Sequence, residues 1–180
     1  IHTPGHSPGH VCFLVGDILL SGDHILARTI PQQWPESVAP CTGLTRYLDS
    51  LAKISRLEGI SVCLGAHEPP VYAIRHRFSE IIAAQDRRVH RVLGLMGEAP
   101  WPATIAELTQ RMYSRQRGFH ELLALTDVGS RIEYLEQRGR VEIANTDELR
   151  RDEAAPVRYR PARGAESLVG ELVGQRGTTA

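Results

Sequence analysis

The sequence lacks a long apolar run and has no net charge. No apolar stretch approaches the length of about 20 residues that a membrane-spanning helix needs, so we expect no membrane partner. The 21 Lys and Arg residues balance 21 Asp and Glu residues, which argues against a polyanion-binding tail. With 42% hydrophobic and 23% charged residues, the composition is typical of a soluble globular protein.

Cysteine is also scarce, and its spacing excludes a disulfide scaffold. Cys12, Cys41 and Cys63 are an odd number of thiols without a C-x-x-C pair. Because Cys12 and Cys63 lie inside apolar runs, we expect buried free thiols and a reducing compartment, the cytoplasm. Cys63 precedes His67 by four positions, yet core packing is favoured over metal ligation for it.

What the chain does contain is three short stretches that set histidine or aspartate beside glycine or proline, at residues 2–10, 21–24 and 65–68. Each lies where an apolar run begins or ends, which is how rigid loops at strand ends hold metal ligands. Imidazole nitrogen suits zinc, and a carboxylate can bridge two cations. A single histidine of this kind is usually an ordinary surface residue, but three such stretches in order predict a metal site.

The three stretches resemble the last three metal-binding motifs of the metallo-β-lactamase-fold hydrolases. They are His-Thr-Pro-Gly-His-Ser-Pro-Gly-His from residue 2, Leu-Ser-Gly-Asp-His from residue 20 and Gly-Ala-His-Glu-Pro from residue 65. The resemblance implies that His6 binds a first metal, that Asp23 bridges two metals as the catalytic carboxylate, and that His67 binds the second. Zinc, two ions in a complete site, is the implied cofactor. His2, His10 and His24 are not ligands in this pattern.

One departure from the family pattern concerns its first motif, His-x-His-x-Asp-His, which is absent from the sequence. The chain opens with Ile1 directly on a predicted strand, so we expect an N-terminally truncated fragment that is inactive alone. The alternative is a degenerate domain, a non-catalytic interaction protein that has lost its metal site.

The expected fold class is α+β. Residues 1–97 are predicted to form the C-terminal half of a metallo-β-lactamase-type αββα sandwich. Within it, a hairpin turns at Gly16-Asp17, an amphipathic helix starts at Leu44, a buried strand covers 60–64 and a long helix covers 74–96. Residues 27–42 show no periodicity and predict a long loop that walls the substrate pocket. Trp34 in this loop is a lid aromatic or a packing anchor.

Residues 98–160 are predicted to form a small winged-helix-like domain, followed by a disordered tail over 161–180. Thr104 and Glu107 have capping-box spacing, and Gly139 ends a second helix before a strand at 141–143. The run over 134–141 is similar to the end of the winged-helix appendage on one branch of the superfamily. Between Pro100 and Arg160, ten Arg balance ten acidic residues, so nucleic acid binding is disfavoured. The module is better interpreted as a cap that shapes the pocket or a homodimer.

The resemblance implies hydrolysis by metal-activated water. Residues 65–68 are also similar to the corresponding stretch of glyoxalase II-like thioesterases, which favours a small-molecule ester or thioester substrate. A nucleic-acid-processing nuclease of the same superfamily and the non-catalytic interaction protein stay as alternatives.

Overall fold

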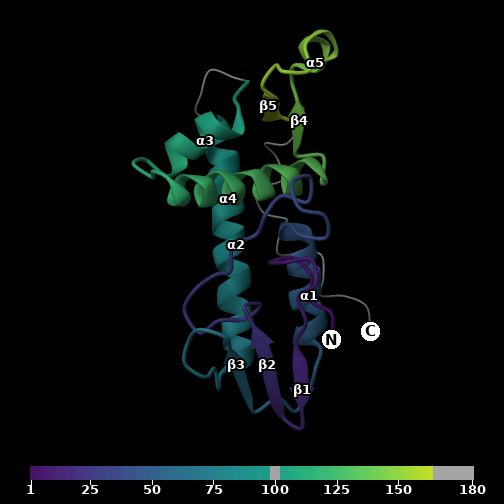
Figure 1. The fold of residues 1–180 in the computed structure, drawn as a ribbon, viewed down its shortest axis with the longest axis vertical. Coiled ribbons are helices and arrows are strands. Elements are labelled where there is room, and N and C mark those ends of the chain that lie inside the picture. Colours follow the sequence, from purple (N-terminus) through teal and green to yellow (C-terminus); the bar gives the residue numbers. More distant parts are fainter. Residues whose placement is uncertain (98–101, 164–180) are drawn as a thin grey trace.

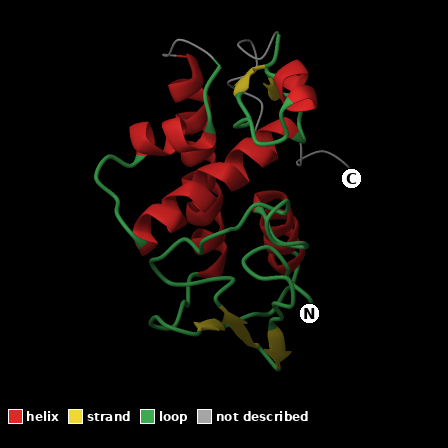
Figure 2. Cartoon of the chain, turned by 45° about the horizontal axis from the view of Figure 1, so that its top comes forward, coloured by secondary structure: helices red, strands yellow, loops and turns green. Residues whose placement is uncertain are grey.

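The computed structural model describes residues 1–97 and 102–163, whose helices and strands gather in two regions (Figure 1). The first region contains β1 (Phe13–Val15), β2 (Ile18–Gly22), α1 (Leu44–Ser55), β3 (Val62–Gly65) and α2 (Ile74–Gly97). The second contains α3 (Ile105–Met112), α4 (Phe119–Glu136), β4 (Val141–Ile143), α5 (Thr146–Arg151) and β5 (Tyr159–Pro161). Figure 2 shows the first three strands at one end of the molecule and the short ribbon at the other, with helices between them.

The sheet of the first region has the order β1-β2-β3. β1 and β2 form the predicted antiparallel hairpin, and Gly16 takes a positive φ of 61° in its turn. β2 and β3 run parallel and are connected through α1, the helix that is predicted to start at Leu44. Parallel strands end at the same edge of a sheet, so the residues after Gly22 and Gly65 are brought together.

One buried core runs through both regions. Leu19 of β2 and Cys63 of β3 lie fully buried in it, together with most of the apolar stripe of the amphipathic helix α1. The buried members of that stripe are Leu44, Tyr47, Leu51 and Ile54. α2 continues the core from the sheet into the second region, where α4 lies across it (Figure 1).

The second region begins with the predicted capping box. The Thr104 hydroxyl accepts a hydrogen bond from the Glu107 amide, and the Glu107 carboxylate accepts one from the Thr104 amide. β4 and β5 pair antiparallel, and α5 lies between them in the sequence. Three helices and a two-stranded ribbon are therefore described in this region, while the winged-helix interpretation stays a prediction.

Residues 98–101, at the predicted domain boundary, and residues 164–180, in the predicted tail, lie outside the described residues. β5 runs through Pro161, one residue beyond the predicted boundary at 160. Within the described ranges, no helix combines the length and the apolar composition of a bilayer span.

Candidate metal centre

Asp23 and His67 are brought together by the parallel pairing of β2 and β3. Gly22 and Gly65 are partners in the register of the two strands, and Asp23 and His67 follow them in the chain. The Ala66 amide donates a hydrogen bond of 2.9 Å to the Gly22 carbonyl, which continues the pairing to the ligand positions. As a result, the Nε2 atom of His67 lies 3.4 Å from Oδ1 of Asp23.

His6 reaches the same carboxylate from the loop before β1. Its neighbour Gly5 bridges to Thr42 at the start of α1 and has a positive φ of 137°. A Cβ atom at Gly5 would overlap the backbone of Tyr47, so glycine is required for this close approach. In the resulting position, the Nε2 atom of His6 lies 3.8 Å from Oδ2 of Asp23.

The three predicted ligands therefore lie together. The imidazoles of His6 and His67 face different oxygens of the Asp23 carboxylate. Oδ1 of Asp23 is buried and accepts no hydrogen bond. Two atoms that bind one tetrahedral zinc ion, each at about 2.1 Å, lie about 3.4 Å apart. The distances from Asp23 to His67 and to His6, 3.4 and 3.8 Å, are close to this value. The donor types and their spacing thus fit a carboxylate shared between two cations.

The described residues supply only part of a coordination sphere. Within residues 1–97 and 102–163, no group of three or more His, Cys, Asp and Glu side chains surrounds a common point where an ion would be held. His6 with Asp23 and His67 with Asp23 instead form two pairs that share the aspartate. Since a zinc site uses about four ligands, each pair leaves positions for further donors.

The protonation pattern of His6 follows from its second nitrogen. Nδ1 of His6 lies 2.7 Å from the backbone carbonyl oxygen of Gln32. A carbonyl only accepts hydrogen bonds, so Nδ1 carries a proton in this contact. In the neutral imidazole, Nε2 then presents its lone pair toward Asp23, the arrangement that a metal ligand needs.

His10 and His24 lie beside these side chains. Both ring nitrogens of His24 are buried and make no hydrogen bond, and its ring packs 4.8 Å from that of Tyr47. Burial, followed by the nearby charge of His10, lowers the pKa of His24 to about 3, so this ring stays neutral. Gly22, with φ of 52°, leaves room for the His10 ring, because a Cβ at Gly22 would lie 2.8 Å from the Nε2 atom of His10.

The sequence reasoning missed two residues that support the site. The Glu68 carboxylate accepts hydrogen bonds from the Arg28 amide, the Thr29 amide and the Thr29 hydroxyl, and these bonds lower its pKa. Glu68 therefore connects the loop that carries His67 to the loop that follows Asp23 through these hydrogen bonds. Gln32, which orients His6, is the second such residue. Glu68 was visible as the neighbour of His67, whereas nothing in the pattern around Gln32 indicated its partner.

Two other expectations have different outcomes. Cys63 is fully buried as a free thiol and donates to the Ser21 hydroxyl at 3.1 Å, so its predicted packing role is confirmed. Gly9, like Gly5, lies between a proline and a histidine, a pattern that predicts a backbone angle or close approach that a Cβ would hinder, and for Gly9 this prediction is wrong. It has no positive φ, and an added Cβ would meet nothing within 4 Å.

A hollow of about 480 Å³ lies beside the first half of α2. Arg28 and Ile30, from the predicted pocket-wall loop, line it together with Arg77 and Glu80 of the helix. None of the three predicted ligands lines this hollow. Trp34 of the same loop is half-buried.

Comparison with known proteins yields relatives in sequence and in structure, although no protein-family profile matches the chain. A lactamase-like protein of Aspergillus fumigatus is 32% identical over 98 residues, which are 53% of this chain and 27% of that protein. An atrochrysone carboxyl ACP thioesterase of the same fungus is 27% identical over 127 residues, 64% of this chain and 38% of that protein.

Two solved structures resemble the fold closely. A metallo-beta-lactamase family protein of Thermus thermophilus superposes with a TM-score of 0.68 at 26% identity, covering 89% of this chain and 48% of that one. A beta-lactamase domain protein of Burkholderia ambifaria superposes with a TM-score of 0.74 at 24% identity, covering 88% of this chain and 46% of that one.

The chain therefore has a mixed α/β fold similar to that of metallo-β-lactamase-fold proteins, and its sequence relatives support the same superfamily. The similarity to metallo-β-lactamase-fold structures implies metal dependence in general. The chain spans about half the length of these solved structures and a smaller part of the two curated relatives.

Proposed function

We propose that the chain is part of a metal-dependent hydrolase that activates water to cleave an ester or thioester bond. The observation that carries this proposal is the convergence of His6 and His67 on the two oxygens of Asp23. Buried polar atoms are almost always hydrogen-bonded, and Oδ1 of Asp23 accepts no hydrogen bond, which favours a cation beside it.

In this proposal His6 and Asp23 would hold one zinc ion, and His67 and Asp23 would hold a second. Bound zinc supplies a Lewis acid that makes water nucleophilic near neutral pH and stabilises negative charge on the substrate oxygen. The chain's own contribution is orientation. The Gln32 carbonyl directs Nε2 of His6 toward Asp23, and the bonds to Glu68 fix the loop that carries His67.

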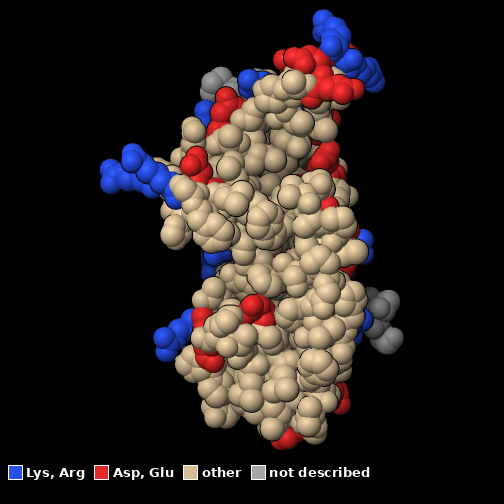
Figure 3. All heavy atoms as spheres, in the orientation of Figure 1, with Lys and Arg blue, Asp and Glu red and all other residues tan. Residues whose placement is uncertain are grey.

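The substrate class is inferred from the relatives. One of them is named as a carboxyl ACP thioesterase, and residues 65–68 are similar to the matching stretch of glyoxalase II-like thioesterases. A nuclease needs a basic surface for its polyanionic substrate. On the face drawn in Figure 3, Lys and Arg of the described residues lie in separate small groups among acidic residues, which favours a small substrate.

Zinc titration against a chromophoric chelator tests the metal centre. We expect Asp23→Asn and His67→Asn to weaken zinc binding by at least about tenfold, because each removes a charged or basic donor atom. His76→Asn is the matched control, since the side chain of His76 is 75% exposed against 72% for His67 and lies on α2. Equal zinc binding by the wild type and all three variants would contradict the proposed centre.

The reaction is tested on the protein in its natural length. We expect zinc-dependent release of thiol from a small acyl thioester and no cleavage of a single-stranded oligonucleotide. Oligonucleotide cleavage that falls steeply with salt would overturn the proposed substrate class in favour of a nuclease. Absence of bound zinc in that protein would overturn the enzyme and favour the interaction protein.

A further inference from the structure

Gln32 contacts the predicted metal ligand His6 with its backbone and the second region with its side chain. Its carbonyl oxygen accepts the Nδ1 proton of His6 at 2.7 Å. Its side-chain amide donates to the Leu123 carbonyl at 2.8 Å and to the Thr126 hydroxyl oxygen at 2.9 Å, both on α4. One residue of the loop thus connects the site to a helix more than 90 positions away in sequence.

The acceptors on α4 are well fixed. The Thr126 hydroxyl shares its single proton between the carbonyls of Leu122 and Leu123 one turn earlier, which leaves its oxygen lone pairs free for the Gln32 amide. Thr126 is buried, and Gln32 is half-buried. Amide hydrogen bonds shielded from water in this way hold their geometry better than exposed ones.

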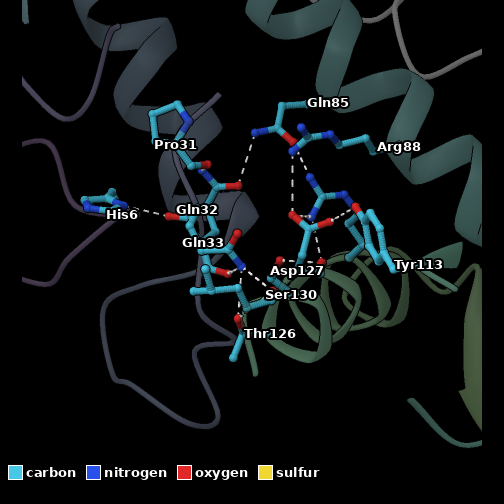
Figure 4. A network of polar contacts seen from close by, with 12 residues as sticks. His6, Pro31, Gln32, Gln33, Gln85, Arg88, Tyr113, Thr126, Asp127 and Ser130 are labelled. Atoms are coloured by element: carbon cyan, nitrogen blue, oxygen red, sulfur yellow. Dashed lines mark hydrogen bonds and ion pairs between the residues drawn. The ribbon is translucent and has the colours of Figure 1, made fainter. Parts of the chain in front are cut away.

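The next residue anchors the same loop to α2. Gln33 is fully buried, and its side-chain oxygen accepts from the Gln85 amide at 3.1 Å. The Gln85 oxygen in turn accepts from the guanidinium of Arg131 on α4 at 2.7 Å. Figure 4 shows this chain of contacts, which leads from His6 through the two glutamines to the helices. The carbonyl that orients His6 is therefore held between two helices.

We propose that Gln32 is a positioning residue for His6, through which α4 determines which imidazole nitrogen faces Asp23. With Nδ1 protonated and bound to the Gln32 carbonyl, Nε2 keeps its lone pair toward the carboxylate. If the carbonyl moves, the neutral ring is free to exchange tautomers, and the form protonated at Nε2 is no longer a ligand. The consequence for metal binding rests on the proposed function, whereas the effect on the His6 tautomer does not.

A purely structural role for the Gln32 side chain predicts something different. Loss of the α4 contacts would then lower the stability of the chain, but His6 would keep its tautomer in the folded state. The tautomer is read from the two ring nitrogen shifts of His6 in long-range ¹H–¹⁵N NMR spectra of the metal-free chain.

Two independent variants act on the link: Gln32→Met removes it, and Thr126→Val weakens it by removing one of its two acceptors on α4. Gln32→Met keeps side-chain length without a donor, and Thr126→Val removes one acceptor with little change of shape. Thr126→Ser keeps the acceptor, and Gln137→Met makes the same glutamine change at the exposed C-terminal end of α4. All four chains are first shown to be folded by circular dichroism, and Thr126→Val decides the outcome if Gln32→Met does not fold.

We expect one His6 tautomer, protonated at Nδ1, in the wild type, Thr126→Ser and Gln137→Met, and a mixture in the two link variants. Zinc affinity should fall about tenfold in the link variants only, the usual effect of losing a partner of a metal-ligating histidine. An unchanged His6 tautomer in folded link variants would overturn the positioning role. Absence of zinc binding in the wild-type protein of natural length would overturn the proposed function, while the tautomer comparison would still decide the role of Gln32.

Discussion

Asp23 in the first region and Asp127 in the second show how differently two carboxylates can be surrounded. Asp127 on α4 is buried, and its oxygens contact the Arg131 guanidinium at 2.7 Å and the Tyr113 hydroxyl at 2.6 Å. Asp23 has a buried oxygen without a hydrogen-bond donor, and its neighbours are two imidazoles rather than a permanent cation. The first carboxylate is satisfied by the protein itself, while the second is arranged for a ligand.

The two regions also differ in how they hold their polar groups. The candidate ligands lie on loops and strand ends, where backbone geometry positions each side chain. Asp127, Arg131 and Gln85 lie on helices and form direct side-chain bonds across the interior. We therefore expect substitutions in the helices to act mainly on stability and substitutions at the loops to act mainly on metal binding.

The largest effect is expected from Arg131→Met. Arg131 is fully buried, and its removal leaves the Asp127 charge without its nearest cation. Breaking a buried pair on one side costs about 3–5 kcal/mol, which urea unfolding measures as a lower free energy of unfolding. The exposed Arg150 on α5, paired with Asp147, is the control, and Arg150→Met should change stability very little.

Asp23→Asn tests the other carboxylate of this comparison. It should leave the free energy of unfolding within about 0.5 kcal/mol of wild type. A loss at Asp23 as large as that of Arg131→Met would show that both carboxylates are structural. If Arg131→Met lowers the free energy of unfolding by less than about 1 kcal/mol, the structural role of the Asp127–Arg131 pair is contradicted.

A smaller effect is expected from Gly5→Ala beside His6. The added Cβ would overlap the Tyr47 backbone, and the φ of 137° is unfavourable for alanine, so we expect a loss of about 2 kcal/mol and weaker zinc binding. Gly9→Ala in the same loop is the control, because its Cβ meets nothing within 4 Å. Similar thermal unfolding of the two variants would show that the close approach at Gly5 does not determine the loop.

The smallest effect concerns alkaline pH. Burial, followed by the charge of Asp127, raises the pKa of Tyr113 to about 12. Between about pH 10 and 12 the unfolded chain releases this proton and the folded chain keeps it, so stability falls as pH rises. The contribution should be about 1 kcal/mol or less, because the Tyr113 side chain is only half-buried.

Urea unfolding of the wild type and Tyr113→Phe at about pH 8 and pH 11 measures this contribution, and the variant should lose less stability with pH. Tyr47 and Tyr159, whose pKa values are also raised by burial, are present in both proteins and cancel in the comparison. Equal losses in the two proteins would contradict the role assigned to Tyr113.

Local patterns predicted the parts of the fold that depend on neighbours in sequence. The Gly16 turn, the apolar stripe of α1 and the Thr104 capping box all follow from short spacings, and all are confirmed. The grouping of His6, Asp23 and His67 was anticipated from motif order, and the structure brings them together, while their role as ligands stays a prediction.

The contacts that the sequence did not reveal depend on distant chain segments meeting. Gln32 lies in a loop without periodicity, and its partners on α4 follow 91 and 94 positions later. The Gln85–Arg131 bond likewise spans 46 positions between two helices. Spacing alone carries no signal for such pairs, because they arise only once α4 is packed across α2.

The three hydrogen bonds that Glu68 accepts from residues 28 and 29 have a mechanical consequence. The segment after Asp23 cannot swing outward without pulling on the residue next to His67. Any displacement of that segment, such as one imposed by an arriving molecule, is thereby transmitted to the imidazole through a few covalent bonds. The segment that follows Asp23 and the loop that carries His67 should consequently move together rather than independently.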